Sequence, residues 1–126
     1  MNDLKVCLAE ITDFEDIQKL FREMFEIFHQ DQNVEYPYTE NGKKYLLQRI
    51  EEKFAFVAKE KNETIGFLTG SINDAIEFKL YKKYGSIENM YIAESYRNKK
   101  DGTLLLQEFV DKCKNLGVNY IQTDSD

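Results

Sequence analysis

Hydrophobic residues recur along this 126-residue chain at two spacings, and each spacing predicts a different kind of element. Between residues 14 and 28 they fall on one face of a helix: Phe14, Ile17, Leu20, Phe21, Met24, Phe25 and Phe28. Similar helical faces recur twice further along, and Gly117 follows the last of them as a C-terminal cap. The pattern therefore predicts amphipathic helices over about 12–28, 43–53 and 103–116.

Short apolar or alternating stretches separate these helices, which is typical of strands. They lie at 4–11, 54–58, 65–72, 86–92 and 118–123. Turn residues between the second and third stretches predict a hairpin there. In the fourth stretch, strict alternation places Glu88, Met90 and Ile92 on one side of the strand.

The predicted order of elements is strand, helix, helix, strand, strand, strand, helix, strand. This order indicates an α/β (α+β) fold built on a mixed sheet, with an antiparallel hairpin in the middle. Because a helix connects the last two strands, we expect those strands to be parallel neighbours. Residues 75–85 fit either a strand extension or a helical turn. The length fits a single domain over residues 1–126.

Composition narrows the classes of function. Seventeen Lys and Arg against 23 Asp and Glu give a net charge of −6, which disfavours a nucleic-acid partner and permits an amine substrate. Cys7 and Cys113 lie far apart, and His29 is the only histidine, so we expect no metal site. No window approaches the ~20 apolar residues of a membrane span. We therefore expect a reduced, cytoplasmic protein without a membrane partner.

The stretch "SYRNKKDGTLLL", residues 95–106, combines cations, a glycine and a leucine run. A helix beginning there directs unpaired N–H groups and the positive end of its dipole toward an anion. Gly102 would let a ligand approach the backbone, and Thr103 adds a hydroxyl donor. The pattern fits a pyrophosphate site. The alternative is a solvated basic loop in which Gly102 serves only as an N-cap.

The unit "IENMYIAESYRNKKDGTLLL" resembles the GNAT superfamily of acyl-CoA-dependent N-acyltransferases, in which a strand is followed by a basic, glycine-containing turn and a leucine-rich helix. "TIGFLTGSI" and the opening strand and helix are similar to that family too. The resemblance implies that acetyl-CoA is a co-substrate, with its pyrophosphate on the turn from Arg97 to Thr103. The residues it assigns to the cofactor are Met90, Ile92, Arg97, Asn98, Lys99, Lys100, Gly102 and Thr103.

Acyl transfer to an amine needs a base, because an alkylamine has a pKa of ~10.4 and is mostly protonated at neutral pH. Glu88 matches the acidic position of the family and is the candidate general base. The alternative is a surface or salt-bridged glutamate. The resemblance makes the backbone N–H of Met90 the donor to the developing oxyanion. An acidic, aromatic loop containing Glu35, Tyr36 and Tyr38 is a candidate substrate wall, with a solvated loop as its alternative.

The chain also departs from the GNAT pattern. Lys100 stands at the first turn glycine, and Asp101 stands where the family prefers an apolar residue. Members usually continue with a further helix and two strands, so we expect a shortened GNAT-like sheet whose last strand has an open edge, which a homodimer would cover. The leading hypothesis is an N-acyltransferase, most simply an acetyltransferase, acting on a primary amine of a small molecule or protein. The alternative is a degenerate domain that serves as a CoA-binding or dimerisation module without catalysis.

Overall fold

A computed structural model describes residues 4–29, 40–75, 82–96 and 101–123. The elements are β1 (Leu4–Leu8), a 3-10 turn (Ile11–Asp13), α1 (Phe14–His29), α2 (Glu40–Glu51), β2 (Ala55–Glu60), β3 (Glu63–Asp74), β4 (Lys83–Ile92), a 3-10 turn η2 (Glu94–Tyr96), α3 (Asp101–Asn115) and β5 (Ile121–Thr123). The predicted order is confirmed. Of the stretch 75–85, residues 83–85 belong to β4, whereas β3 ends at Asp74, so strand extension is confirmed only for 83–85. None of the described helices is long and apolar enough to cross a membrane.

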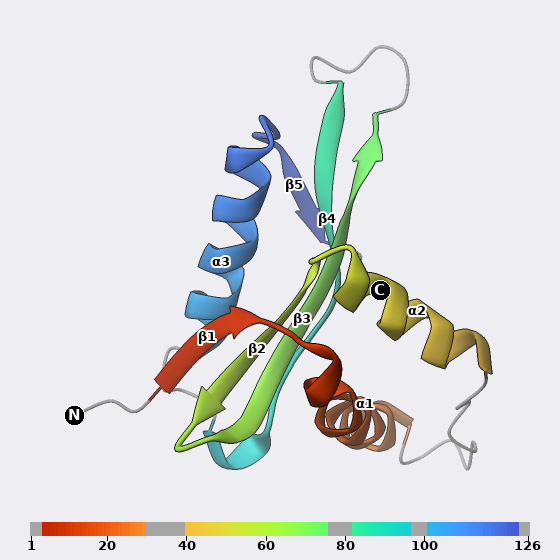
Figure 1. Ribbon diagram of the computed structural model, residues 1–126, viewed down its shortest axis with the longest axis vertical. Coiled ribbons are helices and arrows are strands. Elements are labelled where there is room, and N and C mark those ends of the chain that lie inside the picture. The colour runs from red at the N-terminus through yellow and green to blue at the C-terminus, as the bar shows by residue number, and fades with distance from the viewer. Residues whose placement is uncertain (1–3, 30–39, 76–81, 97–100, 124–126) are drawn as a thin grey trace.

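The strands form one mixed sheet in the order β1-β2-β3-β4-β5 (Figure 1). Neighbours from β1 to β4 are antiparallel, whereas β5 runs parallel to β4, with Gly85 opposite Ile121. The expected parallel pair is therefore confirmed. The crossover through α3 explains it, because a chain that leaves one end of β4 must return to the other end before it can pair in the same direction.

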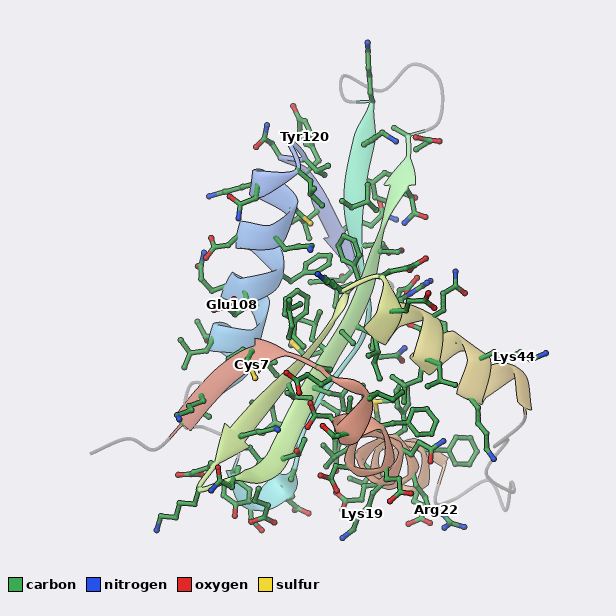
Figure 2. All side chains as sticks on the ribbon, viewed as in Figure 1. Cys7, Lys19, Arg22, Lys44, Glu108 and Tyr120 are labelled. Carbon is green, nitrogen blue, oxygen red and sulfur yellow. The ribbon has the colours of Figure 1, made fainter. Side chains whose placement is uncertain are left out.

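Helices cover both faces of the sheet: α1 and α2 lie on one side and α3 lies on the other (Figure 1). Two buried clusters fill the two interfaces. The cluster under α1 and α2 includes Ile17, Leu20, Leu46, Val57, Phe67 and Tyr91. The cluster under α3 includes Phe56, Leu68, Ile87, Leu105, Phe109 and Cys113. Charged side chains such as Lys19, Lys44 and Glu108 project away from the sheet (Figure 2), so each helix is amphipathic as the sequence predicts.

Two glycines let α3 lie directly on the sheet. A Cβ at Gly70 would stand 2.6 Å from Cε1 of Phe109, and a Cβ at Gly85 would stand 2.6 Å from Sγ of Cys113. Both distances are too short for a side chain. The glycines therefore set the depth at which the Phe109 ring is buried, and they hold α3 close to β3 and β4.

A β-bulge interrupts the pairing of β3 with β4. Thr69 pairs with Asn89 but Gly70 pairs with Ile87, so Glu88 is the extra residue of β4. Because of this extra residue, Glu88 and Asn89 both face α2, and each contacts Tyr45. Met90 instead lies across from Leu68, whose side chain is in the cluster under α3. The expectation that Glu88 shares a side with Met90 and Ile92 is therefore wrong, since it assumed unbroken alternation.

Candidate active site

Within the described residues, the parallel pairing of β4 with β5 reaches only as far as Ile87. Strand β5 pairs only with residues 85–87, and no other described strand pairs with β4 beyond Ile87 on that edge. The N–H of Ala93 donates to the carbonyl of Ile65 on β3 at 2.8 Å. Since N–H groups alternate between the two edges of a strand, the N–H of Met90 points toward the outer edge. Met90, whose side chain is also exposed, therefore presents its backbone where an extended ligand can pair with it.

Helix α3 begins just after the basic stretch of the sequence that contains Arg97, Lys99 and Lys100. It starts at Asp101, so Gly102 lies inside its first turn rather than at the N-cap. A Cβ at Gly102 would meet no described atom within 4 Å, and Thr103 is exposed beside it. This end of the helix thus has room for a ligand against its backbone, as pyrophosphate binding requires. The predicted cofactor residues Arg97, Asn98, Lys99 and Lys100 lie outside the described residues.

Glu88 is held by four hydrogen bonds. Its Oε1 accepts from the Tyr45 hydroxyl at 2.6 Å and from Nε of Arg49 at 2.8 Å. Its Oε2 accepts from Nη2 of Arg49 at 3.2 Å and from the Ser71 hydroxyl at 3.0 Å. Arg49 therefore grips both carboxylate oxygens, and its Nη1 reaches Glu52 at 3.1 Å. Glu88 is therefore a salt-bridged glutamate, which is the alternative that the sequence also allowed.

These contacts set the charge of Glu88. Burial alone would raise the pKa of the Glu88 carboxyl, but the donors on Arg49, Tyr45 and Ser71 outweigh burial and lower this pKa below its ordinary value. The carboxylate is consequently ionised throughout the neutral range. Its side chain keeps 21% of its surface exposed, so solvent still reaches it.

Tyr45 connects this carboxylate to the sheet. Its oxygen lies 2.9 Å from Oγ1 of Thr69 and 3.3 Å from Nδ2 of Asn89. Because the single phenol proton is donated to Glu88, the phenol oxygen accepts from Thr69 and Asn89. Burial, followed by the hydrogen bond to Glu88, raises the pKa of Tyr45 to about 12. The phenol is therefore neutral at physiological pH.

No motif in the sequence assigns Tyr45 or Arg49 to the site. Tyr45 reads as part of the apolar face of α2, and Arg49 reads as one of many surface cations. One signal was available: the two residues are four positions apart, which places them on one face of a helix. In the structure the guanidinium of Arg49 lies 4.8 Å from the centroid of the Tyr45 ring.

Two adjoining cavities lie at the carboxyl end of β4, between α1 and η2. Their volumes are about 350 Å³ and 600 Å³, and both are lined by Glu23, Glu63, Ala93 and Tyr96. Further carboxylates line them at Asp16, Glu26 and Glu94, with Lys19 as the single cation among the described lining residues. This groove carries a negative field. Over the described residues no group of three His, Cys, Asp or Glu side chains is arranged to hold a metal ion.

The predicted substrate residues Glu35, Tyr36 and Tyr38 lie outside the described residues. The groove was not anticipated from the sequence. Its acidic residues come from α1, from the start of β3 and from η2, which are distant along the chain and meet only in the fold.

The fold is a mixed sheet with a bulged strand β4, covered by helices on both faces, and α3 follows the end of β4. Residues 14–126 match the model of the acetyltransferase (GNAT) family. The chain therefore belongs to the GNAT acetyltransferase family. A sequence comparison with curated proteins found no match.

Solved structures with the same fold share little sequence with this chain. An aminoglycoside N-acetyltransferase AAC(6')-Iy in complex with CoA superposes with a TM-score of 0.80 at 14% identity, covering 100% of this chain and 79% of the other. A predicted acetyltransferase from Clostridium acetobutylicum with acetyl-CoA gives 0.78 at 17% identity, covering 98% and 81%. An acetyltransferase from Vibrio fischeri gives 0.75 at 20% identity, covering 95% and 94%. At these identities the likeness shows the fold.

Proposed function

We propose that this protein is an acyl-CoA N-acyltransferase that moves an acetyl group from acetyl-CoA to a primary amine. The observation that carries the proposal is that, among the described residues, β5 pairs with β4 only as far as Ile87, while the N–H of Met90, two residues beyond Glu88, points toward that same edge. A thioester bound along this edge would have an N–H donor and a carboxylate within reach. Two of the similar structures contain CoA or acetyl-CoA, which supports the choice of cofactor.

The described residues fit such a cofactor. Main-chain N–H groups at the start of α3 would hold the pyrophosphate, where Gly102 leaves space. The cations that precede the helix in the sequence, Arg97, Lys99 and Lys100, would neutralise the charge of the pyrophosphate. The pantetheine arm would pair as an added strand with the backbone of Met90 and Ile92.

Met90 and Glu88 then have distinct chemical roles. The amine nitrogen attacks the thioester carbonyl carbon and the carbon–sulfur bond breaks, so that an amide forms and CoA leaves as its thiol. The N–H of Met90 would stabilise the oxyanion that forms on the carbonyl oxygen. Glu88 would accept the proton lost by the amine, through a water molecule, because its low pKa keeps it ionised and ready. The thiolate would take its proton from solvent.

The acidic groove favours a cationic acceptor. Its carboxylates attract ammonium groups, and Tyr91 in its wall belongs to the same strand as Glu88, three residues further on. The Tyr91 hydroxyl donates to Glu23 at 3.4 Å, which links the strand to α1 beside the groove. We therefore place the amine substrate, a small polyamine-like molecule or a lysine-rich segment, on this side of the sheet.

A second function is favoured by a specific observation. The Glu88 carboxylate already accepts four hydrogen bonds, which is also what a purely structural glutamate would show. In that case the chain would be a CoA-binding or dimerisation module without catalysis. A second copy would cover the outer edge of β5, against which no described strand lies.

Calorimetric titration with acetyl-CoA tests the cofactor site. Wild-type protein should bind, and Gly102→Trp should abolish binding because an indole would fill the open space at the start of α3. Leu116→Trp is the matched control, since Leu116 is 54% exposed beyond the other end of the helix. Absence of heat with wild-type protein would remove the cofactor claim.

Release of free thiol from acetyl-CoA then separates the two functions. The assay would use polyamines, aminoglycosides and lysine peptides as acceptors. Amine-dependent thiol release supports the enzyme. Binding without thiol release, together with a dimer in sedimentation, supports the module.

A further inference from the structure

Helix α2 reaches across the sheet to the one residue of β4 that has no partner opposite it. Glu88 is the extra residue of the bulge, and its side chain meets Tyr45 and Arg49, one helical turn apart. The Arg49 and Glu88 side chains are only 16% and 21% exposed. Such a pair is shielded from solvent and has the two-point geometry that fixes a carboxylate in direction as well as in place.

The contacts around Tyr45 also have a fixed direction. Asn89 can donate to both Tyr45 and Thr69, Thr69 donates to Tyr45, and Tyr45 donates to Glu88. Thr69 is fully buried, so water does not compete for its hydrogen bonds and the direction of donation stays the same. The phenol is therefore aimed at Oε1 of Glu88 by two neighbours on the sheet.

We propose that Arg49 and Tyr45 are positioning residues of the active site, which act by holding the Glu88 carboxylate in one orientation on the bulge and do not touch the substrate. The proposal rests on the proposed transferase function. It assigns to α2 a part in the reaction that neither the sequence pattern nor the family match supplies. Arg49 contributes a positive charge and a bidentate contact to the two carboxylate oxygens, whereas Tyr45 contributes one hydrogen bond.

Among the described residues, three side chains donate hydrogen bonds to Glu88. Tyr45 and Arg49 come from α2, Ser71 comes from β3, and Glu52 acts only through Arg49. Removing Arg49 should therefore raise the pKa of Glu88, as removing an opposite charge at close range does by about one to three pH units. A higher pKa alone would make Glu88 a stronger base. A fall in rate together with a rise in pKa would report lost orientation and not lost basicity.

The first experiment measures the Glu88 carboxyl titration by NMR in the free protein, with the signal assigned by its absence in Glu88→Gln. Arg49→Met should raise the Glu88 pKa. Arg49→Lys should raise it less, because lysine keeps the positive charge but cannot contact both carboxylate oxygens as the guanidinium does. Glu52→Gln is the control, since it removes only the outer partner of Arg49 and should leave the Glu88 pKa in place. An unchanged Glu88 pKa in folded Arg49→Met overturns the proposal.

The second experiment measures kcat and KM for the same variants. Arg49→Met should lower kcat about tenfold to a hundredfold, with KM for acetyl-CoA within about twofold of wild type. The kcat of Arg49→Lys should lie between those of wild type and Arg49→Met. Tyr45→Phe should lose less kcat than Arg49→Met, and it replaces Arg49→Met in the test if that variant does not fold. An unchanged kcat in variants whose Glu88 pKa has risen overturns the positioning role. Absence of turnover in wild-type protein overturns the proposed function instead, whatever the titration shows.

Discussion

The hydroxyl of Tyr45 donates a 2.6 Å hydrogen bond to Oε1 of Glu88, which ties helix α2 to the bulge of β4. Both partners are largely enclosed, and Glu88 is ionised. A hydrogen bond to a charged group contributes more to stability than a bond between neutral groups. The bond therefore bears on both the stability of the fold and the shape of the proposed site.

Replacing Tyr45 with Phe should lower the free energy of unfolding by about 2 kcal/mol, since a bond to an ionised acceptor is lost and its partners keep their polarity. Denaturant unfolding measures the change. Tyr96→Phe is the matched control: its hydroxyl also donates to a carboxylate, Glu63 at 3.1 Å, but at an exposed site where water replaces it. If Tyr45→Phe and Tyr96→Phe lowered the free energy of unfolding equally, burial would not be what makes the Tyr45 hydrogen bond stabilising.

The alkaline titration of Tyr45 should be delayed. Its pKa is raised from the ordinary tyrosine value of 10.0 to about 12, so the folded protein keeps this phenol protonated after the unfolded chain has begun to lose the proton. Stability from this group is complete below the unfolded pKa and is lost as the pH rises through the folded pKa. We expect one tyrosine to form tyrosinate last in an absorbance titration, and that late step to vanish in Tyr45→Phe. A late step that persists in this variant would assign it to another tyrosine.

Glu88→Gln should lower kcat about a hundredfold or more at neutral pH if Glu88 accepts the proton of the amine. The loss should shrink at high pH, where more of the amine is already neutral. Glu52→Gln, which removes a carboxylate that contacts Arg49 and Gln48 and makes no hydrogen bond to Glu88, is the control and should stay near wild type. Circular dichroism would confirm that both variants fold. Unchanged rates in Glu88→Gln would retire Glu88 as the base.

Gly70→Ala should destabilise the fold by about 1–3 kcal/mol, because the added methyl group overlaps Phe109 and the Ser86 carbonyl, each 2.6 Å from the built Cβ. Gly102→Ala should instead be neutral or stabilising, since alanine favours helix and no described atom lies within 4 Å. Thermal unfolding of the two variants measures the contrast. A stable Gly70→Ala protein would mean that α3 can shift away from the sheet at little cost.

The two cysteines should react at very different rates. Cys7 is exposed, whereas Cys113 is buried against the sheet and burial raises its thiol pKa. Mass spectrometry after brief treatment with a thiol-alkylating reagent should therefore show one added group, which Cys7→Ser removes. A second group should appear only in denaturant. Rapid double labelling of the native protein would show that α3 detaches readily.

Local signals in the sequence were sufficient for most of the fold. The apolar period defined the helices, and the strand–helix–strand order at the end of the chain required β4 and β5 to be parallel. Gly117 was predicted to end α3, and it has φ of 79° with the Val118 N–H bonded to the Cys113 carbonyl at 2.8 Å. Such signals are local because hydrogen bonding within a helix and capping involve residues close in sequence.

The bulge was beyond the reach of the sequence. A single extra residue in β4 moved Glu88 to the face of Asn89, and no composition cue in "SIENMYI" marks where pairing slips. The slip depends on which residues of β3 lie opposite. The partners of Glu88 on α2 likewise depend on where this helix lies on the sheet, which the sequence does not specify.

The amino-acid sequence by itself determined the elements, their order and the family, because these follow from spacing and motif along the chain. The tertiary structure alone decided that Arg49 and Tyr45 contact Glu88 and that carboxylates from α1, the start of β3 and η2 line one groove. The physical reason is that charge pairing and burial depend on distance in space, and residues 39 or 43 positions apart come into contact only when the sheet and helices pack together.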